Sequence, residues 1–332
     1  MREIFIAGAG PAGTAAAISG RLEGSLVRSV DRTRTARHKV CGEFLSPGTR
    51  EILEQLSVWD QVAALGARPI RRCALNLANG TKRWTLPECG WGLSRLELDR
   101  LLLNQAVTLG AAVERGTVFD LAGQASGAVV VACGRKPSRA EDDRLFGFKA
   151  HFEGPGDDAV ELFFDARGYV GVSGIEGGVT NVCGIAREST LRQLGFDFDE
   201  IVRRSAPLAE RLRPLERRMR WLVAGPLAFS PPGSGTRSGA VYEAGDSLSF
   251  VDPFTGSGIM NALLTGRLAG QAAARGTSPE QYRRKCRSLL GVPFLISSML
   301  RRLAAHAEWH HGARYLPGRL LFEWTRANMG RA

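Results

Sequence analysis

The sequence EIFIAGAGPAGTAAAISG at residues 3–20 decides the fold of this chain. It begins with an apolar run long enough for a short buried strand. Three glycines in Gly-x-Gly-x-x-Gly spacing follow, and then an alanine-rich stretch typical of a helix. A second apolar run, LVRSVD at residues 26–31, predicts another strand and ends at an acidic residue. Strand, glycine turn, helix and strand in this order predict a Rossmann-like α/β unit.

The glycine turn has the residue types that a dinucleotide-binding site needs. Gly8 allows the tight turn, Gly10 lets the backbone approach a pyrophosphate, and Gly13 lets the helix pack closely on the strand. The first turn of the helix offers free N–H groups and the positive end of the helix dipole. Asp31 closes the second strand, where a carboxylate can accept hydrogen bonds from ribose hydroxyls. The alternative is a glycine-rich turn without a ligand.

A second glycine-rich loop, GDSLSFVDPFTGSG at residues 245–258, stands between an expected strand at 240–244 and an expected helix at 259–274. Asp246, close behind the strand, can bind the hydroxyl groups of a sugar-like chain. The glycines open a helix whose N-terminal N–H groups and dipole, worth roughly +0.5 charge, stabilise a developing anion. A reduced isoalloxazine is such an anion.

Together these segments resemble the FAD-dependent oxidoreductases of the para-hydroxybenzoate hydroxylase and geranylgeranyl reductase superfamily. Residues 245–269 resemble its second flavin signature, RHKVCGE at 37–43 resembles the loop after the ribose-binding acid, and SRLELDRLL at 94–102 resembles its arginine-bearing helix start. The resemblance covers about residues 1–275. It implies the α/β class, with a Rossmann-like FAD-binding domain of the GR2 type, an interleaved β-sheet substrate domain and C-terminal helices.

The domain boundaries are expected where the composition changes between helical and strand-like segments. The FAD-binding domain is expected at residues 1–67, 93–147 and 226–275, the substrate domain at 68–92 and 148–225, and a basic helical segment at 276–332.

The resemblance also implies which residues bind the cofactor, which is expected to be FAD. Arg95 would lie along the cofactor near its phosphates, and Val118 would meet the adenine through its backbone. The full set of implied cofactor-binding residues is Gly8, Gly10, Pro11, Ala12, Gly13, Asp31, Arg37, Cys41, Arg95, Val118, Asp246, Pro253, Gly256, Gly258 and Ile259.

Two residues of the loop at 37–43 are candidate catalytic groups. The Cys41 thiol could protonate a product carbanion or shape the substrate pocket, in a setting made electropositive by Arg37 and Lys39, or it could simply pack in the loop. Glu43 could orient the substrate or act as a base, and the alternative is a hydrogen-bonding or surface residue.

The resemblance implies two reactions, and the sequence favours the first. In a monooxygenase, NADPH or NADH reduces FAD and oxygen is delivered to an aromatic or polyketide-like substrate. In a geranylgeranyl-reductase-like enzyme, hydride passes to a carbon–carbon double bond of a prenyl or other lipid substrate. A third alternative, from a different class, is a non-enzymatic module that carries flavin or binds an anionic partner.

Departures from the family pattern bear on this choice. The middle motif, usually Asp-Gly, reads Cys133-Gly134 and is followed by Ser138 and Arg139, so the engagement of NADPH or NADH is expected to differ. The aromatic motif of prenyl reductases is replaced by YVGVSG at residues 169–174. The Trp-x-Trp-x-Ile-Pro motif and catalytic lysine of flavin-dependent halogenases are not found.

The composition excludes several classes of protein. With 332 residues, of which 44% are hydrophobic and 23% charged, the sequence is not that of a disordered, collagen-like or coiled-coil chain. Its six cysteines include no Cys-x-x-Cys pair, which is evidence against a zinc ribbon or a thioredoxin-like motif. No apolar run reaches the ~18 residues of a spanning helix, so a cytoplasmic location is expected. Reduced thiols are expected in that compartment.

The formal net charge of +11 is concentrated near the C-terminus. Residues 267–332 hold 12 basic and 3 acidic residues, a net charge of 12 − 3 = +9. Leucines and tryptophans are interleaved with these arginines, so the segment is expected to make peripheral contact with a membrane or to pack as helices on the parent domain. It has no recognised nucleic-acid motif. His306 and His310 lack an evident third ligand, so no metal site is expected.

Overall fold

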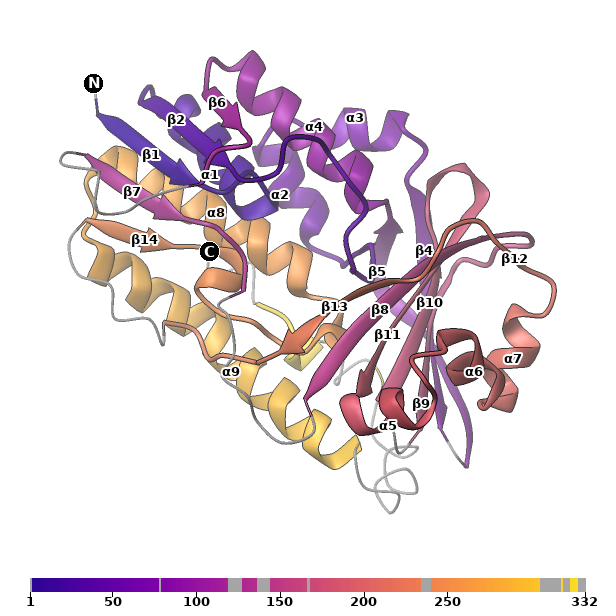
Figure 1. Ribbon diagram of the computed structural model, residues 1–332. Coiled ribbons are helices and arrows are strands. Elements are labelled where there is room, and N and C mark those ends of the chain that lie inside the picture. The colour runs from indigo at the N-terminus through magenta and orange to yellow at the C-terminus, as the bar shows by residue number, and fades with distance from the viewer. Residues whose placement is uncertain are drawn as a thin grey trace.

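The computed structural model describes residues 2–77, 79–118, 127–135, 144–165, 168–233, 240–304, 318 and 323–327. These residues form two sheets that lie side by side, with helices beneath the smaller sheet and on the outer face of the larger one (Figure 1). The α/β class with a Rossmann-like sheet and a separate mixed sheet is confirmed.

The smaller sheet is parallel and has the strand order β14-β7-β1-β2-β6. Its strands are β1 (Glu3–Ala7), β2 (Leu26–Asp31), β6 (Ala112–Arg115), β7 (Ala128–Val131) and β14 (Val241–Glu243). The central strand β1 carries Ile4 and Ile6 on the face under the helices, where both are fully buried, and Phe5 on the opposite face. The run from Ile4 to Ala7 is apolar at every position, with Phe5 partly buried against Val129, Val131 and Val241 on the face opposite the helices.

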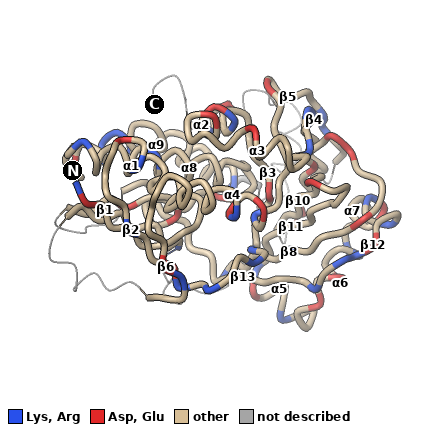
Figure 2. The backbone as a smooth tube through the Cα atoms, turned by 90° about the horizontal axis from the view of Figure 1, so that it is seen from above, with Lys and Arg blue, Asp and Glu red and all other residues tan. Residues whose placement is uncertain are grey.

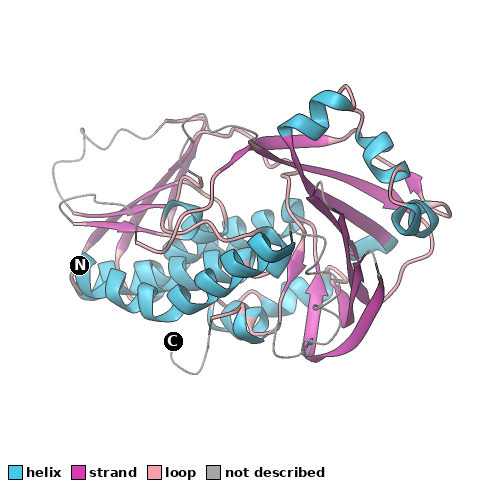
Figure 3. Cartoon of the chain, turned by 90° about the horizontal axis from the view of Figure 1, so that it is seen from below, coloured by secondary structure: helices cyan, strands magenta, loops and turns pink. Residues whose placement is uncertain are grey.

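Helices cover one face of this sheet (Figure 3). They are α1 (Pro11–Leu22), α4 (Arg95–Thr108) and α8 (Gly258–Arg275), accompanied by α2 (Thr49–Gln55), α3 (Trp59–Ala64) and the long α9 (Pro279–Ala304). Helices α1 and α8 touch backbone to backbone at Gly266 and Gly270. A Cβ atom at either glycine would lie less than 3.0 Å from a carbonyl oxygen of α1. The two helices that follow the glycine-rich loops are therefore held together at close range.

The larger sheet has the order β12-β8-β11-β10-β9-β4-β5-β3, with β13 also paired to β8. Its strands are β3 (Phe44–Leu45), β4 (Arg68–Leu77), β5 (Gly80–Gly92), β8 (Leu145–Glu153), β9 (Ala159–Asp165), β10 (Gly168–Gly174), β11 (Val179–Arg187), β12 (Glu216–Arg217) and β13 (Leu222–Leu227). Neighbouring strands are antiparallel except β4 and β9, which are parallel. The expected hairpin across Asn79-Gly80 is the β4–β5 pair.

Side-chain alternation assigns the two faces of the larger sheet. On β8, Phe148, Ala150 and Phe152 face an outer core, and the intervening Lys149 and His151 face the smaller sheet. The outer core is closed by α5 (Glu188–Gln193), α6 (Phe198–Arg203) and α7 (Ala206–Leu212). Acidic and basic residues gather on the surface around α6, α7 and β12 (Figure 2). The other face of the sheet is left for a site between the two sheets.

Of the basic C-terminal segment, the structure describes mainly α9, a single helix of 26 residues. His306, His310 and His311 lie outside the described residues. None of the helices in the described ranges has the length and hydropathy required to cross a membrane.

The close packing of α1 on α8 yields a first prediction. We expect Gly266→Ala to destabilise the protein by about 1–3 kcal/mol, because the added methyl group collides with backbone that cannot rotate away. The matched control is Gly291→Ala in α9, where a Cβ would meet nothing within 4 Å and helix propensity improves by up to about 1 kcal/mol. Urea unfolding of both variants checks this, and equal midpoints would contradict the packing argument.

Candidate functional site between the two sheets

The first glycine turn is shaped by contacts that only glycine permits. Gly8 has φ 103°, and a Cβ there would collide with the Ala132 carbonyl. A Cβ at Gly13 would collide with the carbonyl of Gly8, so the helix start presses directly on the turn. In contrast, a Cβ at Gly10 would meet nothing within 4 Å, and α1 begins there without a side-chain cap. The free N–H groups of α1 therefore face open space suited to an anion.

Asp31 connects this turn to the end of β2. Its carboxylate accepts hydrogen bonds from the Ala9 N–H and the Thr33 N–H, each at 2.7 Å, and from the Thr33 hydroxyl. Burial alone would raise the pKa of Asp31, but these hydrogen bonds outweigh it and hold the pKa below its usual value. The ionised carboxylate keeps a lone pair for a further donor, because two oxygens offer about four acceptor sites.

The second glycine loop repeats this arrangement at α8. Helix α8 has no side-chain cap at Ser257, and a Cβ at Gly258 would meet nothing within 4 Å. The loop before it is held by Asp252, which accepts a hydrogen bond from the Phe254 N–H. Two uncapped helix N-termini, those of α1 and α8, thus belong to one pair of packed helices.

Asp246 and the start of α4 carry charges close to this loop. Burial raises the pKa of Asp246, and the nearby Arg135 and Arg95 oppose that rise. The Arg95 guanidinium donates to Asp99 at 2.9 and 3.1 Å and also lies beside the Cys41 thiol. Arg95 is therefore held in place by Asp99, and its charge acts on Asp246.

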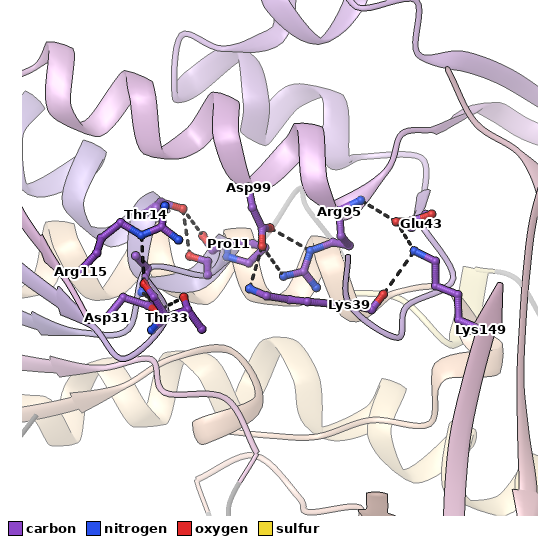
Figure 4. Close-up of polar contacts among 12 residues, drawn as sticks. Pro11, Thr14, Asp31, Thr33, Lys39, Glu43, Arg95, Asp99, Arg115 and Lys149 are labelled. Atoms are coloured by element: carbon purple, nitrogen blue, oxygen red, sulfur yellow. Dashed lines mark hydrogen bonds and ion pairs between the residues drawn. The ribbon is translucent and has the colours of Figure 1, made fainter. Parts of the chain in front are cut away.

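Asp99 receives a second cation, because the Lys39 ammonium donates to it at 2.8 Å (Figure 4). Burial would raise the pKa of Asp99, but Arg95 and Lys39 outweigh it and keep the pKa low. The loop at residues 37–43 is tied to α4 by this pair of contacts.

Glu43 lies at the join between the two sheets and is fully buried. Its carboxylate accepts a hydrogen bond from the backbone N–H of Arg95 at 2.7 Å and pairs with the Lys149 ammonium (Figure 4). It also accepts a hydrogen bond from His151 Nε2 at 2.7 Å. Burial would raise its pKa, yet the hydrogen bond from His151 and the charge of Lys149 lower it overall. Glu43 also adopts φ 53°, a left-handed conformation that costs about 1–2 kcal/mol for a non-glycine residue. The side chain points to Lys149 and His151 while its neighbours face the cavity.

Lys149 and His151 were not among the predicted site residues, although their strand carries a local signal. The stretch FGFKAHF at residues 146–152 alternates apolar and polar side chains, which is the pattern of a half-buried strand with a polar inner face. Donor atoms of His38, Glu43 and His151 lie within 4.8 Å of one another, a spacing compatible with a metal. Because the Lys149 ammonium already pairs with the Glu43 carboxylate, we interpret these side chains as an ion-pair network and not as a metal site.

A cavity of about 210 Å³ lies between the second glycine loop, the loop at residues 37–43 and the inner face of the larger sheet. Four of the predicted site residues line it together, and Gly42 and Arg135 line it beside them; the four are Cys41, Asp246, Pro253 and Gly256. The opposite wall comes from β4, β9, β10 and β11 and is mainly apolar, with Leu75, Val160 and Leu162 as examples. The structure thus brings the candidate thiol and the second glycine loop to one apolar space.

Other predicted residues lie elsewhere. Val118 follows β6, whose end hydrogen-bonds to Asp31 through the Gly116 N–H at 2.7 Å; its side chain is 79% exposed. Arg37 is exposed at the surface of its loop. Cys133 is exposed as a residue, and its thiol donates to the Ala7 carbonyl at 3.4 Å. Ser138 and Arg139 lie outside the described residues.

A buried acid beneath the second loop was not anticipated. Asp252 accepts a hydrogen bond from the Tyr169 hydroxyl at 3.2 Å and lies 3.3 Å from Arg301 of α9. Burial raises the pKa of Asp252 to about 6, against lowering contributions from the Phe254 N–H and Arg301. Tyr169 itself lines the cavity, so this acid joins the inner sheet face, the loop and the C-terminal helix.

Comparisons with known proteins agree with this arrangement. Residues 1–138 match the family model of the FAD binding domain. The chain is 26% identical to digeranylgeranylglycerophospholipid reductase 1 of Methanothermobacter thermautotrophicus, covering 87% of this chain and 83% of that protein. It is 27% identical to menaquinone reductase of Mycolicibacterium smegmatis, covering 82% and 76%.

Solved structures with the same fold include the flavin-dependent brominase Bmp2, at a TM-score of 0.79 and 16% identity, covering 99% of this chain and 95% of that one. A geranylgeranyl bacteriochlorophyll reductase-like protein of Thermoplasma acidophilum has a TM-score of 0.74 at 18% identity, covering 99% and 94%. Residues 1–138 therefore carry an FAD binding domain, and the similarity of most of the chain to two reductases supports an FAD-dependent oxidoreductase, that is, an enzyme.

The buried ion pair at the join yields the second prediction. We expect Glu43→Gln to destabilise the protein by about 3–5 kcal/mol, because it leaves the Lys149 ammonium buried without its carboxylate. The double variant with Lys149→Met should recover part of this loss, since the uncompensated charge is then removed. Glu54→Gln, in an exposed pair with Arg50, serves as the control and should change stability by less than about 1 kcal/mol. A double variant no more stable than Glu43→Gln alone would contradict the role of the pair.

Asp252 yields a prediction on pH. An unfolded aspartate titrates near pH 3.9, so a folded pKa of about 6 means that folding is favoured below pH 4 and loses stability as the pH rises to 6. The loss from this group is of order 3 kcal/mol. We therefore expect Asp252→Asn, measured by urea unfolding against the unaltered protein, to gain relative stability between pH 4 and 7. A difference that stays constant over this range would show that Asp252 titrates normally.

Proposed function

We propose that this oxidoreductase reduces a carbon–carbon double bond in an apolar substrate of prenyl or other lipid type. The observation that carries the proposal is the mainly apolar cavity, which has the Cys41 thiol and the second glycine loop in one wall and β4, β9 and β10 in the other. Such a cavity favours the body of an apolar molecule over a polar one.

The residues present fit FAD. Open space at Gly10 and Gly258 lies in front of two uncapped helix N-termini, where phosphate and the electron-rich edge of a flavin would be stabilised. We propose that Gly8, Gly10, Pro11, Ala12, Gly13 and Asp31 hold the adenosine and pyrophosphate half. We propose that Val118 meets the adenine of this half through its backbone. We propose that Arg37, Arg95, Asp246, Pro253, Gly256, Gly258 and Ile259 hold the remainder, with Cys41 at the reactive edge.

Reduction of a double bond adds one hydride and one proton to its two carbons. Bound FAD supplies hydride-transfer chemistry, and the chain must supply the proton and exclude water. The Cys41 thiol lines the cavity and lies beside the Arg95 guanidinium, so it is placed to give a proton to a substrate bound there. These contacts support Cys41 as the proton donor, and the buried contacts of Glu43 support a positioning role for that residue.

The printed names of both curated relatives are those of reductases, one of a digeranylgeranyl lipid and one of menaquinone. Because of these names we propose lipid reduction in place of the aromatic hydroxylation that the sequence favoured. NADPH or NADH stays in the proposal as the reductant.

A lipid substrate would also suit the surface of α9. Val292, Leu295 and Met299 are more than half exposed on one side of this helix, and Arg302 follows on the same side. An apolar stripe beside basic residues is the pattern of a helix that lies on an anionic membrane. We therefore keep peripheral membrane contact as part of the proposal.

Anaerobic turnover tests the proposed function. FAD-loaded protein is incubated with NADPH, then NADH, and geranylgeraniol as the prenyl probe, and the lipid is analysed by mass spectrometry. We expect hydrogenated product without oxygen, and a fall of about 100-fold in rate for Cys41→Ala because general acid catalysis contributes factors of this size. Cys89→Ala is the matched control, since that thiol donates to the Gly90 carbonyl on β5.

Three outcomes would each contradict a part of this proposal. Product that forms only after air is admitted, and that carries a new oxygen atom, would support the hydroxylase instead. Flavin that accepts electrons from dithionite but from neither nucleotide would exclude NADPH and NADH as reductants. Failure to bind FAD at all would remove the basis of both.

A further inference from the structure

Three of the six cysteines of this chain line the cavity. Cys41 belongs to the loop at residues 37–43, Cys183 to β11 and Cys73 to β4. All three are free thiols; Cys41 and Cys183 are half-buried, and Cys73 is buried. A small oxidant that enters the cavity therefore meets more than one thiol. Which of them can react with one another depends on how the fold spaces them.

Hydrogen bonds hold Cys41 against the strand that carries Cys183. The Asn181 side chain donates to the carbonyl oxygens of Cys41 and Gly42 at 3.1 and 2.9 Å. Side chains alternate along a strand, so Asn181 and Cys183 are consecutive side chains on one face of β11. Val182, between them, packs in the outer core, so this face is the inner one. The backbone at Cys41 is therefore fixed to β11 next to Cys183.

Cys41 and Cys183 also interact directly. The backbone N–H of Cys41 lies beside the Cys183 sulfur, and the two thiol groups interact electrostatically. Burial raises the pKa of Cys183, and the thiol of Cys41 adds to that rise, so Cys183 keeps its proton at neutral pH. A disulfide requires two Cα atoms about 4.4–6.8 Å apart, which is the range of residues in direct contact.

Cys41 is the thiol of this pair that an oxidant would attack first. It lies beside the Arg95 guanidinium, and its sulfur accepts a hydrogen bond from the Glu43 N–H at 3.5 Å. Cysteines that oxidise selectively are partly exposed thiols next to cationic groups, often with a second thiol close by. Cys41 has all of these features, and Cys183 supplies the second thiol.

We propose that Cys41 and Cys183 are a redox-sensitive pair that hydrogen peroxide converts into a disulfide across the cavity. The Cys41 sulfur attacks the peroxide, so that an S–O bond forms, the O–O bond breaks and one water leaves. The Cys183 sulfur then attacks the Cys41 sulfur, so that the S–S bond forms, the S–O bond breaks and a second water leaves with the Cys183 proton. The two sulfurs lose two electrons in total, and the peroxide is reduced to water.

The disulfide changes the site in two ways. It removes the Cys41 proton, and it ties the loop at residues 37–43 covalently to β11. An added thiol reverses both changes by thiol–disulfide exchange. The formation of the disulfide does not depend on the proposed function, and only its effect on turnover does.

Cys73 offers a matched control inside the same cavity. Its strand, β4, is separated from β11 by β10 and β9 in the larger sheet. Neighbouring strands lie about 4.8 Å apart, so β4 and β11 are roughly 14 Å apart. Cys73 is therefore too far from Cys183 to form a disulfide with it.

Peptide mapping of the FAD-loaded full chain tests this inference. The folded protein is treated with hydrogen peroxide, the remaining thiols are blocked with iodoacetamide, and the digest is analysed by mass spectrometry with and without dithiothreitol. We expect a cross-linked peptide that joins Cys41 to Cys183, is two hydrogen atoms lighter than its parts and is split by dithiothreitol. Cys183→Ala should lose the cross-link and leave Cys41 as a sulfinic acid, which dithiothreitol does not reverse. Cys73→Ala should keep the cross-link at the level of the unaltered protein.

Protein unfolded in urea before the peroxide is added is the control for the fold, because its thiols should then pair without this preference. Three results would overturn the inference: free thiols at both Cys41 and Cys183 after other thiols have oxidised, a disulfide from either of them to another cysteine, or an equal loss of the cross-link in Cys73→Ala. The map of the unaltered protein decides the matter even if Cys183→Ala does not fold. A protein that reduces geranylgeraniol but forms no cross-link would refute this inference alone, and the reverse result would refute the proposed reduction alone.

Discussion

The buried carboxylate of Glu43 holds the two halves of this protein in register. It accepts a hydrogen bond from the first turn of α4 on one side and pairs with Lys149 and His151 of β8 on the other. A charge without solvent must be matched by nearby donors, so the three partners cannot separate without a cost of several kcal/mol. The left-handed backbone at Glu43 is retained for the same reason, because it aims the carboxylate into the join.

The candidate site depends on this join. Cys41 and Gly42, just before Glu43, line the cavity, and Phe44, just after it, enters the larger sheet as part of β3. Asn181 of β11 donates to the carbonyls of Cys41 and Gly42 at 3.1 and 2.9 Å, which fixes this loop from the opposite side. The cavity is therefore bounded by a rigid loop rather than by a free segment. That rigidity suits a site in which a thiol must be held at one position.

The two glycine-rich loops were predictable because their signals are local. Gly8, Gly10 and Gly13 each meet a steric requirement within a few residues, and the spacing of these requirements follows from the geometry of a strand, a turn and a helix. The hairpin at Asn79-Gly80 and the limits of α8 are local for the same reason. Asp252 could not be assigned from its motif, because its raised pKa comes from burial in the folded protein. Tyr169 and Arg301, whose contacts oppose that rise, also lie far away in sequence.

By itself the sequence determined the strand–turn–helix units, their cofactor-type glycines and the acids that close them, since each depends on neighbouring residues. The pattern FGFKAHF at 146–152 also determined that β8 has a polar face, but it did not indicate which residue the polar side chains would contact. The tertiary structure alone decided that Lys149 and His151 meet Glu43 and that Arg326 reaches the cavity beside Thr255. These pairings form because residues far apart in sequence are buried together in the folded protein. A local stretch of sequence does not show which distant residue will be buried against it.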